Sequence, residues 1–310
     1  MRKATIIILL FATLLIAGCA QLPGLPKKSG PGIIATTQSI TVEVKNPRSD
    51  EPVSGNYEFS PIIEAFNSGG ADSEGVVCIS GLSEDTFRGF IGCECQDFNV
   101  YADETDGETS QELEFGPYPI TADEQKEELM TAATRYTYET KAQAKACIKK
   151  DVYSKTGCLV TNIANQKRDL MTGSTSGAIK ITKITENIIP VDESLVTLAF
   201  NVEVEKARTG DIYDYDKAGY QTCRSEEKQS KLITGEISGL PQGGIECTEA
   251  ELDEKGTGTL VCEAENLRLF DSRGNFLFSG DSYEPDIEVN IRYGYEQIST
   301  IKFSVAPGTK

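Results

Sequence analysis

The sequence contains no histidine and no tryptophan, and it has fewer basic residues than acidic ones, 30 against 48. Without histidine, Ser-His and Cys-His catalysis, imidazole metal ligation and proton transfer by imidazole near neutral pH are excluded. The net charge of −18 argues against nucleic acid as a partner, because phosphate binding needs a basic face that releases counterions. The glycine motifs of phosphate loops, dinucleotide folds and nucleophile elbows are also absent.

The length and the apolar content bound what remains. A chain of 310 residues is typical of about two domains. With 39% hydrophobic residues it can bury packed cores, so it does not have the composition of a disordered tail. The sequence therefore predicts folded domains and leaves the question of what they bind.

The N-terminus has the pattern of an export signal. Arg2 and Lys3 precede an uncharged apolar run over residues 4–18, which is short for a permanent membrane span and suited to a signal peptide. The run ends in Ile16-Ala17-Gly18-Cys19, which resembles the lipobox of prokaryotic lipoproteins. That resemblance implies cleavage of residues 1–18, a diacylglycerol on the sulfur of Cys19, and an extracytoplasmic protein anchored to the cell membrane. The alternative is a plain secretory signal or an uncleaved anchor in which Cys19 occurs by chance.

A flexible tether is expected over residues 19–38, where proline and glycine recur and no helix or strand period survives. Such a tether spans a distance on the order of 25 Å.

The remainder contains three repeated landmarks in the same order. The tripeptide Ala-Phe-Asn occurs at 65–67 and 199–201, a pair of cysteines 15 positions apart at 78 and 93 and again at 247 and 262, and Arg-Tyr-x-Tyr-Glu at 135–139 and 292–296. We interpret them as two copies of one domain. The first is expected at residues 39–150, a connector at 151–177, and the second at 178–310 with an insertion at about 206–242.

Each copy has the pattern of β-strands. Residues 39–44 and 179–184 alternate apolar and polar side chains, and residues 194–204 are rich in β-branched and aromatic types. Residues 290–305 are expected to form paired strands. Short strands separated by Gly, Asn and Asp turns predict an all-β fold of two tandem antiparallel Ig-like β-sandwich domains. Residues 64–79, with the turn Asn67-Ser-Gly-Gly-Ala-Asp, resemble the CARDB-type Ig-like domains of prokaryotic surface proteins.

Two segments are harder to assign. Residues 140–150 have helix-forming composition, but period two aligns them with the last strand of the second copy, so we expect a strand. Residues 121–124 have a capping-box pattern ahead of EQKEELM and predict a short helix that connects strands.

Eight cysteines remain if Cys19 carries lipid, an even set that suits an oxidising compartment. The repeated interval predicts the disulfides Cys78–Cys93 and Cys247–Cys262. Two schemes stay open for the rest: Cys95–Cys147 with Cys158–Cys223, or Cys147–Cys158 with Cys95–Cys223. A zinc site at Cys93-Glu-Cys95 is disfavoured, because two further close ligands are missing.

Few residues suggest a site. Asp211, Asp214 and Asp216 form an acidic loop that is either a Ca²⁺ site or simply solvated, and no other cofactor is expected. Residues 103–108 form a similar acidic turn. Tyrosines interleaved with the first loop are expected to form a contact surface: Tyr213, Tyr215 and Tyr220. We expect the two Arg-Tyr-x-Tyr-Glu strands to carry structural cross-strand pairs.

These patterns favour a non-enzymatic, lipid-anchored cell-surface protein that acts as a binding, adhesion or envelope-scaffold module. Its expected partners are the membrane, through the lipid, and an envelope or cell-surface protein or glycan. The alternative is a pilin-like filament subunit, in which cleavage precedes the apolar run and that helix polymerises. A carboxylate or metal enzyme is the third class, although no spacing of acids selects a catalytic pair.

Overall fold

The computed structural model describes residues 40–48, 52–54, 58–67, 72–101, 109–154, 156–158, 167–172, 177–214 and 231–307. Within these ranges the regular secondary structure is β-strand, and the strand pairs between elements are antiparallel. The expected all-β, antiparallel class is therefore confirmed. The signal peptide, Cys19 and the tether lie outside the described residues.

The largest sheet in the described part of the chain has eight strands, six of them in the order β15-β14-β19-β8-β4-β5. Two short strands join it, β13 beside β19 and β16 beside β14. The members are β4 (Ser73–Ser80), β5 (Cys93–Val100), β8 (Lys126–Lys145), β13 (Asp211–Tyr213), β14 (Leu232–Ser238), β15 (Ile245–Glu246), β16 (Ala250–Glu251) and β19 (Asp286–Val305).

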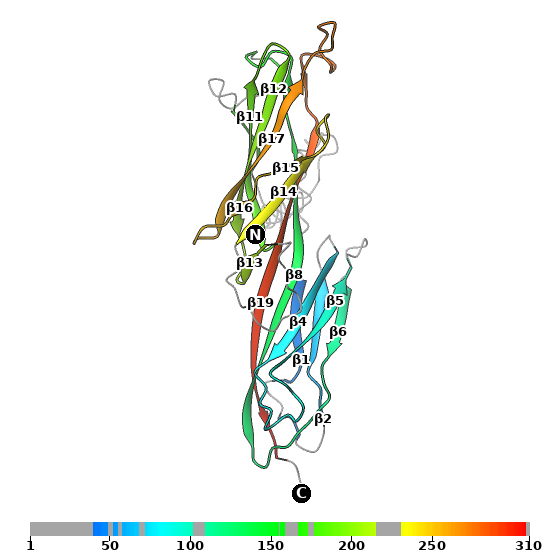
Figure 1. Cartoon of the computed structure of the whole chain (residues 1–310), viewed down its shortest axis with the longest axis vertical. Helices are drawn as coiled ribbons and strands as arrows, with labels where there is room; N and C mark the ends of the chain where they lie inside the picture. The colour runs from blue at the N-terminus through cyan, green and yellow to red at the C-terminus, as the bar shows by residue number, and fades with distance from the viewer. Residues whose placement is uncertain are drawn as a thin grey trace, which may run out of the picture. The chain divides into compact units, whose positions relative to one another are not determined.

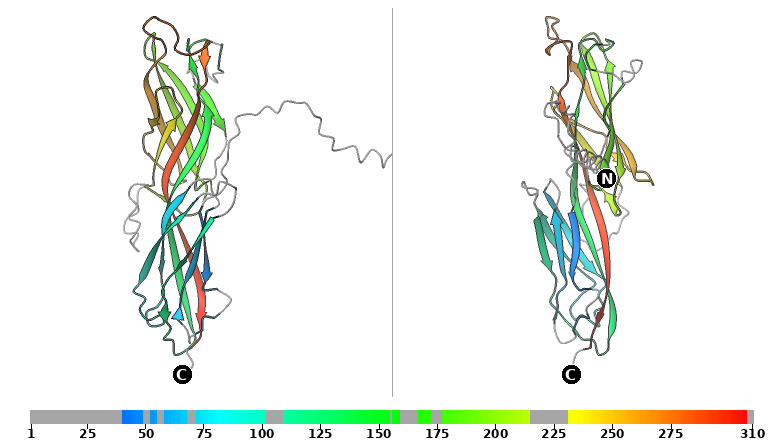
Figure 2. Two further views of the ribbon diagram at one scale, coloured as in Figure 1. Left: turned by 90° about the vertical axis from the view of Figure 1, so that its right-hand side faces the viewer. Right: turned by 180° about the vertical axis from the view of Figure 1, so that it is seen from behind.

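Two long strands, β8 and β19, form the centre of this sheet. They pair along all 20 residues of each, from Lys126↔Val305 to Lys145↔Asp286, and run side by side in Figures 1 and 2. Side chains of β8 alternate strictly between buried and more exposed positions, as a strand with one face on a core requires. The two strands thus join the two expected copies within one sheet.

Two smaller sheets, one of three strands and one of four, carry the repeated tripeptide on an inner strand. Ala65-Phe66-Asn67 lies on the middle strand of β1-β3-β6, and Ala199-Phe200-Asn201 lies on β12 between β11 and β17. The strands are β1 (Ile40–Asn46), β3 (Ile62–Asn67), β6 (Thr109–Glu114), β10 (Lys167–Thr172), β11 (Ile179–Pro190), β12 (Leu195–Lys206) and β17 (Thr257–Arg268). Two short pairs complete the described elements, β2 (Glu58–Phe59) with β7 (Tyr118–Pro119) and β9 (Ile148–Lys149) with β18 (Ser282–Tyr283).

The Arg-Tyr-x-Tyr-Glu landmarks occupy equivalent places, but the cysteine landmark does not. β4 pairs with β8 as far as Tyr136, the second residue of this motif, and β14 pairs with β19 as far as Arg292, the first residue of its second occurrence. Cys78 and Cys93 lie on β4 and β5, whereas Cys262 lies on β17, a strand of the other sheet. The equal spacing of the two cysteine pairs is therefore a coincidence of sequence.

The insertion in the second copy is shorter than expected. Its expected range, 206–242, contains β14, which is the counterpart of β4 and belongs to the repeated unit. The additional residues of the second copy lie between β12 and β14, and the described part of them includes β13.

Three local expectations can be compared with the strands. The helix expected after Thr121 is wrong: residues 121–125 are irregular and β8 starts at Lys126, with Leu129 exposed and Met130 buried in the period of a strand. The strand expected at 140–150 is confirmed by the second half of β8 and by β9. Residues 290–305 form one strand, β19, rather than a pair, because their partner is β8.

The buried side chains form one continuous cluster that includes both halves of the chain. Phe303, near the end of β19, packs on two aromatic rings of the first half, Phe59 at 5.4 Å and Phe87 at 6.1 Å between centroids. The C-terminal strand therefore contributes core to the part built from residues 40–145, and residues 33–310 form one unit.

Candidate functional site

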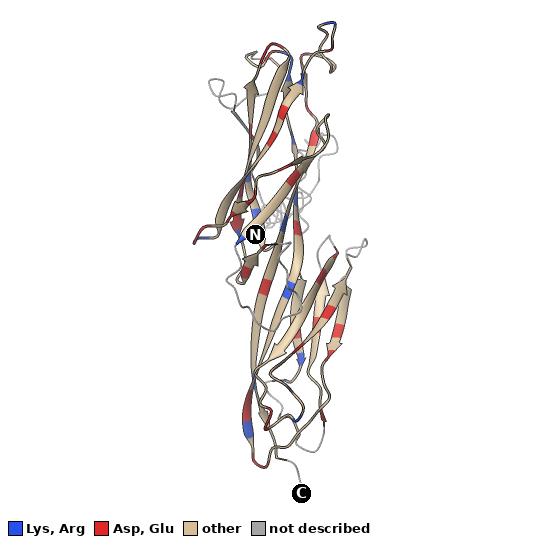
Figure 3. Cartoon of the chain, in the orientation of Figure 1, with Lys and Arg blue, Asp and Glu red and all other residues tan. Residues whose placement is uncertain are grey.

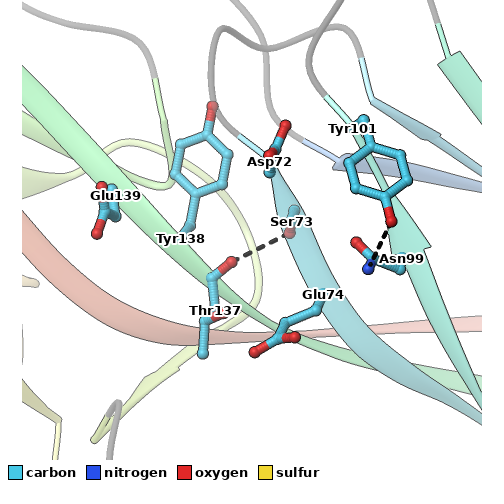
Figure 4. Close-up of a pocket in the computed structure, with 8 residues that line it drawn as sticks. All are labelled: Asp72, Ser73, Glu74, Asn99, Tyr101, Thr137, Tyr138 and Glu139. Atoms are coloured by element: carbon cyan, nitrogen blue, oxygen red, sulfur yellow. Dashed lines mark hydrogen bonds between the residues drawn. The ribbon is translucent and has the colours of Figure 1, made fainter.

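A polar hollow of about 280 Å³ opens where β4 begins, beside the middle of β8 and the end of β5 (Figure 4). Its lining combines carboxylates, hydroxyls and one carboxamide: Asp72, Ser73, Glu74, Asn99, Tyr101, Thr137, Tyr138 and Glu139. Three separate segments of the chain contribute, and the sheet brings them together.

The hollow exists because β4 leaves β8 at this point. In chain order, Gly75 is the first residue of β4 that pairs with β8, and it lies opposite Tyr136. A Cβ on Gly75 would lie 2.3 Å from the carbonyl oxygen of Arg135, so only glycine permits this close approach. Before Gly75, at the N-terminal end of β4, a side chain replaces the backbone pairing with β8: the hydroxyl of Ser73 donates to the carbonyl oxygen of Thr137 at 3.1 Å. A side chain thus holds a carbonyl that a neighbouring strand would otherwise bind.

Glu139 is a carboxylate of the hollow that basic side chains hold in place. It accepts from Arg292 at 3.0 Å and lies 3.6 Å from the ammonium of Lys141. Arg292 also donates to Glu236 at 3.1 Å. These side chains are partly exposed, so each ion pair contributes modestly to stability. Their effect is to orient Glu139, while Glu74 remains exposed at the rim.

The two tyrosines of the hollow differ in burial. Tyr101 is 59% exposed, and its hydroxyl accepts a hydrogen bond from Asn99 at 3.2 Å. Tyr138 is buried, which raises the pKa of its phenol to about 12. Both rings stand at the sides of the hollow in Figure 4, with Asp72 between them. At neutral pH the site offers negative charge, hydrogen-bond acceptors and aromatic surface.

Acidic side chains are also frequent outside the hollow. They are spread over the described strands and their connections, as Figure 3 shows in red. A cationic ligand is therefore favoured by the charge of the whole chain as well as by the carboxylates at the hollow.

The paired Arg-Tyr-x-Tyr-Glu motifs have the structural role expected of them. Because the strands run antiparallel, each arginine meets the glutamate of the other copy: Arg135 bonds to Glu296 at 2.8 Å, and Arg292 bonds to Glu139. The tyrosines also face each other, Tyr136 with Tyr295 and Tyr138 with Tyr293, at centroid distances of 5.4 and 6.1 Å. These are cross-strand pairs of the kind that stabilise sheets.

Tyr213 lies inside the sheet rather than at a contact surface. It is 5% exposed, its ring covers Gly294, and its hydroxyl donates to the carbonyl oxygen of Tyr136 at 3.3 Å. It does not present the exposed ring that the predicted recognition role requires. Tyr215 and Tyr220 lie outside the described residues, as does the acidic turn 103–108.

The proposed Ca²⁺ ligands are only partly described. Asp211 is exposed and lies 4.0 Å from the ammonium of Lys206, whereas Asp214 is buried. Asp216 lies outside the described residues. The Ca²⁺ interpretation therefore stays a prediction.

The disulfides follow strand register. Cys247–Cys262 forms as expected, but Cys78 bonds to Cys95, which lies directly opposite it on β5, so the expected Cys78–Cys93 pair is wrong. Cys147 bonds to Cys158, which removes the Cys95–Cys147 scheme. The second scheme is confirmed for Cys147–Cys158, but its Cys95–Cys223 pair is wrong because Cys95 bonds to Cys78. Cys93 is also disulfide-bonded, and Cys223 lies outside the described residues.

Among the described residues, the one group of three or more metal-ligating side chains within 4.8 Å of each other is Cys78, Cys93 and Cys95. All three sulfurs are held in disulfides, so none is available as a thiolate.

The lining of the hollow was not found from the sequence. Residues 72–74, 99 and 101 belong to no motif, because three separate segments each contribute only two or three residues to the lining. The available signal was the shared Arg-Tyr-x-Tyr-Glu motif, which contains Thr137, Tyr138 and Glu139 but indicated structure rather than a site.

No family model and no curated protein matches this chain. Across the part of the chain that the structure describes, no helix has both the length and the apolar character to cross a membrane. The disulfides indicate an extracytoplasmic protein, because such bonds form and persist in oxidising compartments.

Proposed function

We propose that this chain is an extracytoplasmic, lipid-anchored and non-enzymatic protein that acts as a binding, adhesion or envelope-scaffold module. The observation that carries the proposal is that the described cysteines are held in disulfides, which suits a protein exported from a reducing cytoplasm. The lipobox pattern ending in Cys19 supports attachment to the membrane after export. Two or more acyl chains at Cys19 would anchor the protein stably, whereas one would not.

The folded part is proposed to consist of two Ig-like units of CARDB type that share β8 and β19. The matching strand orders β1-β3-β6 and β11-β12-β17 support this proposal. Domains of this kind usually carry binding sites on a rigid scaffold rather than catalytic centres, although fold alone does not define function.

A binding role is supported by the composition and by the hollow. The sequence has no histidine for acid–base or nucleophilic chemistry. The hollow beside β8 offers carboxylates, hydroxyls and aromatic surface, which suit recognition of a protein or glycan at the cell surface. Nucleic acid is disfavoured by the strong negative charge.

The anchor is tested by growing cells on radiolabelled fatty acid and isolating wild type, Cys19→Ala and Cys223→Ala proteins. We expect label in wild type and in Cys223→Ala, which keeps the lipobox cysteine, and no label in Cys19→Ala. Equal labelling of wild type and Cys19→Ala would refute the anchor.

The mature N-terminus, determined by mass spectrometry, separates this proposal from its rival. A blocked N-terminus at Cys19 is the expected result. A free N-terminus near Thr5 would indicate a pilin-like filament subunit instead.

A further inference from the structure

The position beside residues 137–139 of β8 has a filled counterpart in the second copy. Through the repeated motif, Thr137, Tyr138 and Glu139 correspond to Gly294, Tyr295 and Glu296 of β19. In the second copy β13 pairs antiparallel with these residues, as Asp211↔Glu296, Ile212↔Tyr295 and Tyr213↔Gly294. In the first copy the corresponding residues line the hollow.

Among the described residues, no strand occupies the edge of β8 at this position. β4 pairs with β8 only from Thr131 to Tyr136, and no described strand pairs with the following residues on the side away from β19. The carbonyl of Thr137 points to this side, where it accepts the hydroxyl of Ser73, so an added strand would take the place of that hydroxyl. Backbone groups two residues apart in a strand point the same way, so those of Glu139 face this edge too.

We propose that the hollow binds an extended segment of a partner protein, which adds to β8 beside residues 137–139 in the way that β13 adds to β19. The inference rests on the proposed binding function and specifies its ligand class. Addition of a strand to an open sheet edge is a recurring mode of peptide recognition, in which main-chain hydrogen bonds supply affinity and side-chain pockets supply specificity.

The residues on β8 define the side chains of that segment. Its residue opposite Glu139 is basic, because Glu74 and Asp72 also line the hollow and opposite charges across strands attract. Its next residue, opposite Tyr138, is aliphatic, as the buried Ile212 is in β13. Its third residue lies opposite Thr137 and is small. In the second copy the large ring of Tyr213 fits opposite position 294 only because that residue is glycine, and the side chain of Thr137 leaves no such space in the first copy. Read from its N-terminus, the segment is basic, aliphatic, small.

The test uses the full-length protein in detergent and a fluorescein-labelled peptide of about ten residues with Lys-Val-Ser at its centre, flanked by Thr and Val. Binding is measured by fluorescence anisotropy up to about 1 mM peptide. We expect saturable binding that weakens about tenfold or more when Lys is replaced by Glu. N-methylation of Lys and Ser, whose amides face β8, is expected to abolish binding, and N-methylation of Val is expected to preserve it.

A protein variant places the binding in the hollow. Glu74→Lys is expected to weaken binding of the Lys peptide about tenfold and to strengthen binding of the Glu peptide. Glu263→Lys, a substitution at an exposed position on β17, is expected to leave binding of both peptides unchanged. No saturable binding, equal effects of the two methylation patterns, or equal affinity of wild type and Glu74→Lys would each overturn the proposal. None of these results depends on Cys19, so failure of the lipid anchor is distinguished by fatty acid labelling alone.

Discussion

Single residues decide how closely the strands of the central sheet approach. Gly294 is the clearest case: a Cβ at this position would lie 2.1 Å from the nearest ring carbon of Tyr213. Tyr213 itself reaches across β19 to the backbone of β8. A glycine in a strand normally weakens it, and here the loss is offset by the packing of a whole aromatic ring.

Gly294→Ala is expected to destabilise the protein by about 1–3 kcal/mol, because the added methyl group forces the ring of Tyr213 out of its place. The free energy of unfolding is measured by urea denaturation. In the Tyr213→Ala background the same substitution is expected to cost much less, since the clash is gone. Gly244→Ala is the control, because its Cβ would have ordinary contact at 3.4 Å. Additive effects of the two substitutions would contradict the packing.

Buried tyrosines make stability depend on alkaline pH. Burial raises the pKa of Tyr138 to about 12 and raises the pKa of Tyr136 and Tyr293 as well. In the unfolded chain these phenols ionise near pH 10. The unfolded state therefore loses protons first, so this contribution to stability is complete below about pH 10 and is lost as pH rises toward 12.

The corresponding measurement is urea unfolding between about pH 8 and pH 11.5. We expect a constant free energy of unfolding up to about pH 10 and a decrease above it of about 1.4 kcal/mol per pH unit for each buried phenol. Tyr138→Phe is expected to reduce that slope, and Tyr153→Phe, at an exposed position, is expected to leave it unchanged. An unchanged slope in Tyr138→Phe would show that this phenol ionises normally.

At the scale of elements, register rather than sequence interval selects the disulfides. In C-x-C on a strand, Cys93 and Cys95 lie on the same face, and only the β4–β5 register decides which of them meets Cys78. Register also decides the ion pairs, because full-length pairing of β8 with β19 places each arginine opposite the glutamate of the other copy.

Removing the Cys147–Cys158 disulfide is expected to destabilise the protein by about 3 kcal/mol, because the open chain gains entropy when unfolded. The bond closes a loop of 11 positions next to β9. The double variant Cys147→Ala/Cys158→Ala, which leaves no unpaired thiol, is compared with wild type by thermal unfolding. A loss below about 0.5 kcal/mol would indicate that this segment contributes little to stability.

At the scale of the whole molecule, the two halves of the chain share one core. Phe303 and Val305 of β19 are buried with residues of the first copy, and Val53 forms a bridge with Val305. A domain cut at the predicted boundary would lose these contacts and expose one full edge of β8.

The isolated fragment 39–150 is therefore expected not to fold, whereas residues 39–310 are expected to unfold in one cooperative transition. Circular dichroism during urea denaturation distinguishes the two. A cooperative transition of the fragment would show that the first copy is an independent domain and that the pairing of β8 with β19 is dispensable for its folding. The result tests the predicted boundaries at 150 and 178 directly.

The sequence by itself determined the all-β class and several strand segments, among them residues 179–184 and 194–204, and it predicted two copies of one unit. These properties depend on period two and on local composition, which are visible in any one segment. The helix predicted from residues 121–130 is wrong, because the burial of alternate residues in the sheet stabilises a strand more than a capping-box pattern stabilises a helix.

The tertiary structure alone decided which strands are neighbours. Alternation assigns a side chain to a face but carries no information about its partner across the sheet, since many registers bury the same face pattern. The pairing of β8 with β19, the Cys78–Cys95 bond and the hollow beside residues 137–139 all depend on such neighbours. Each of them joins segments that are distant in sequence, and only the folded sheet brings them into contact.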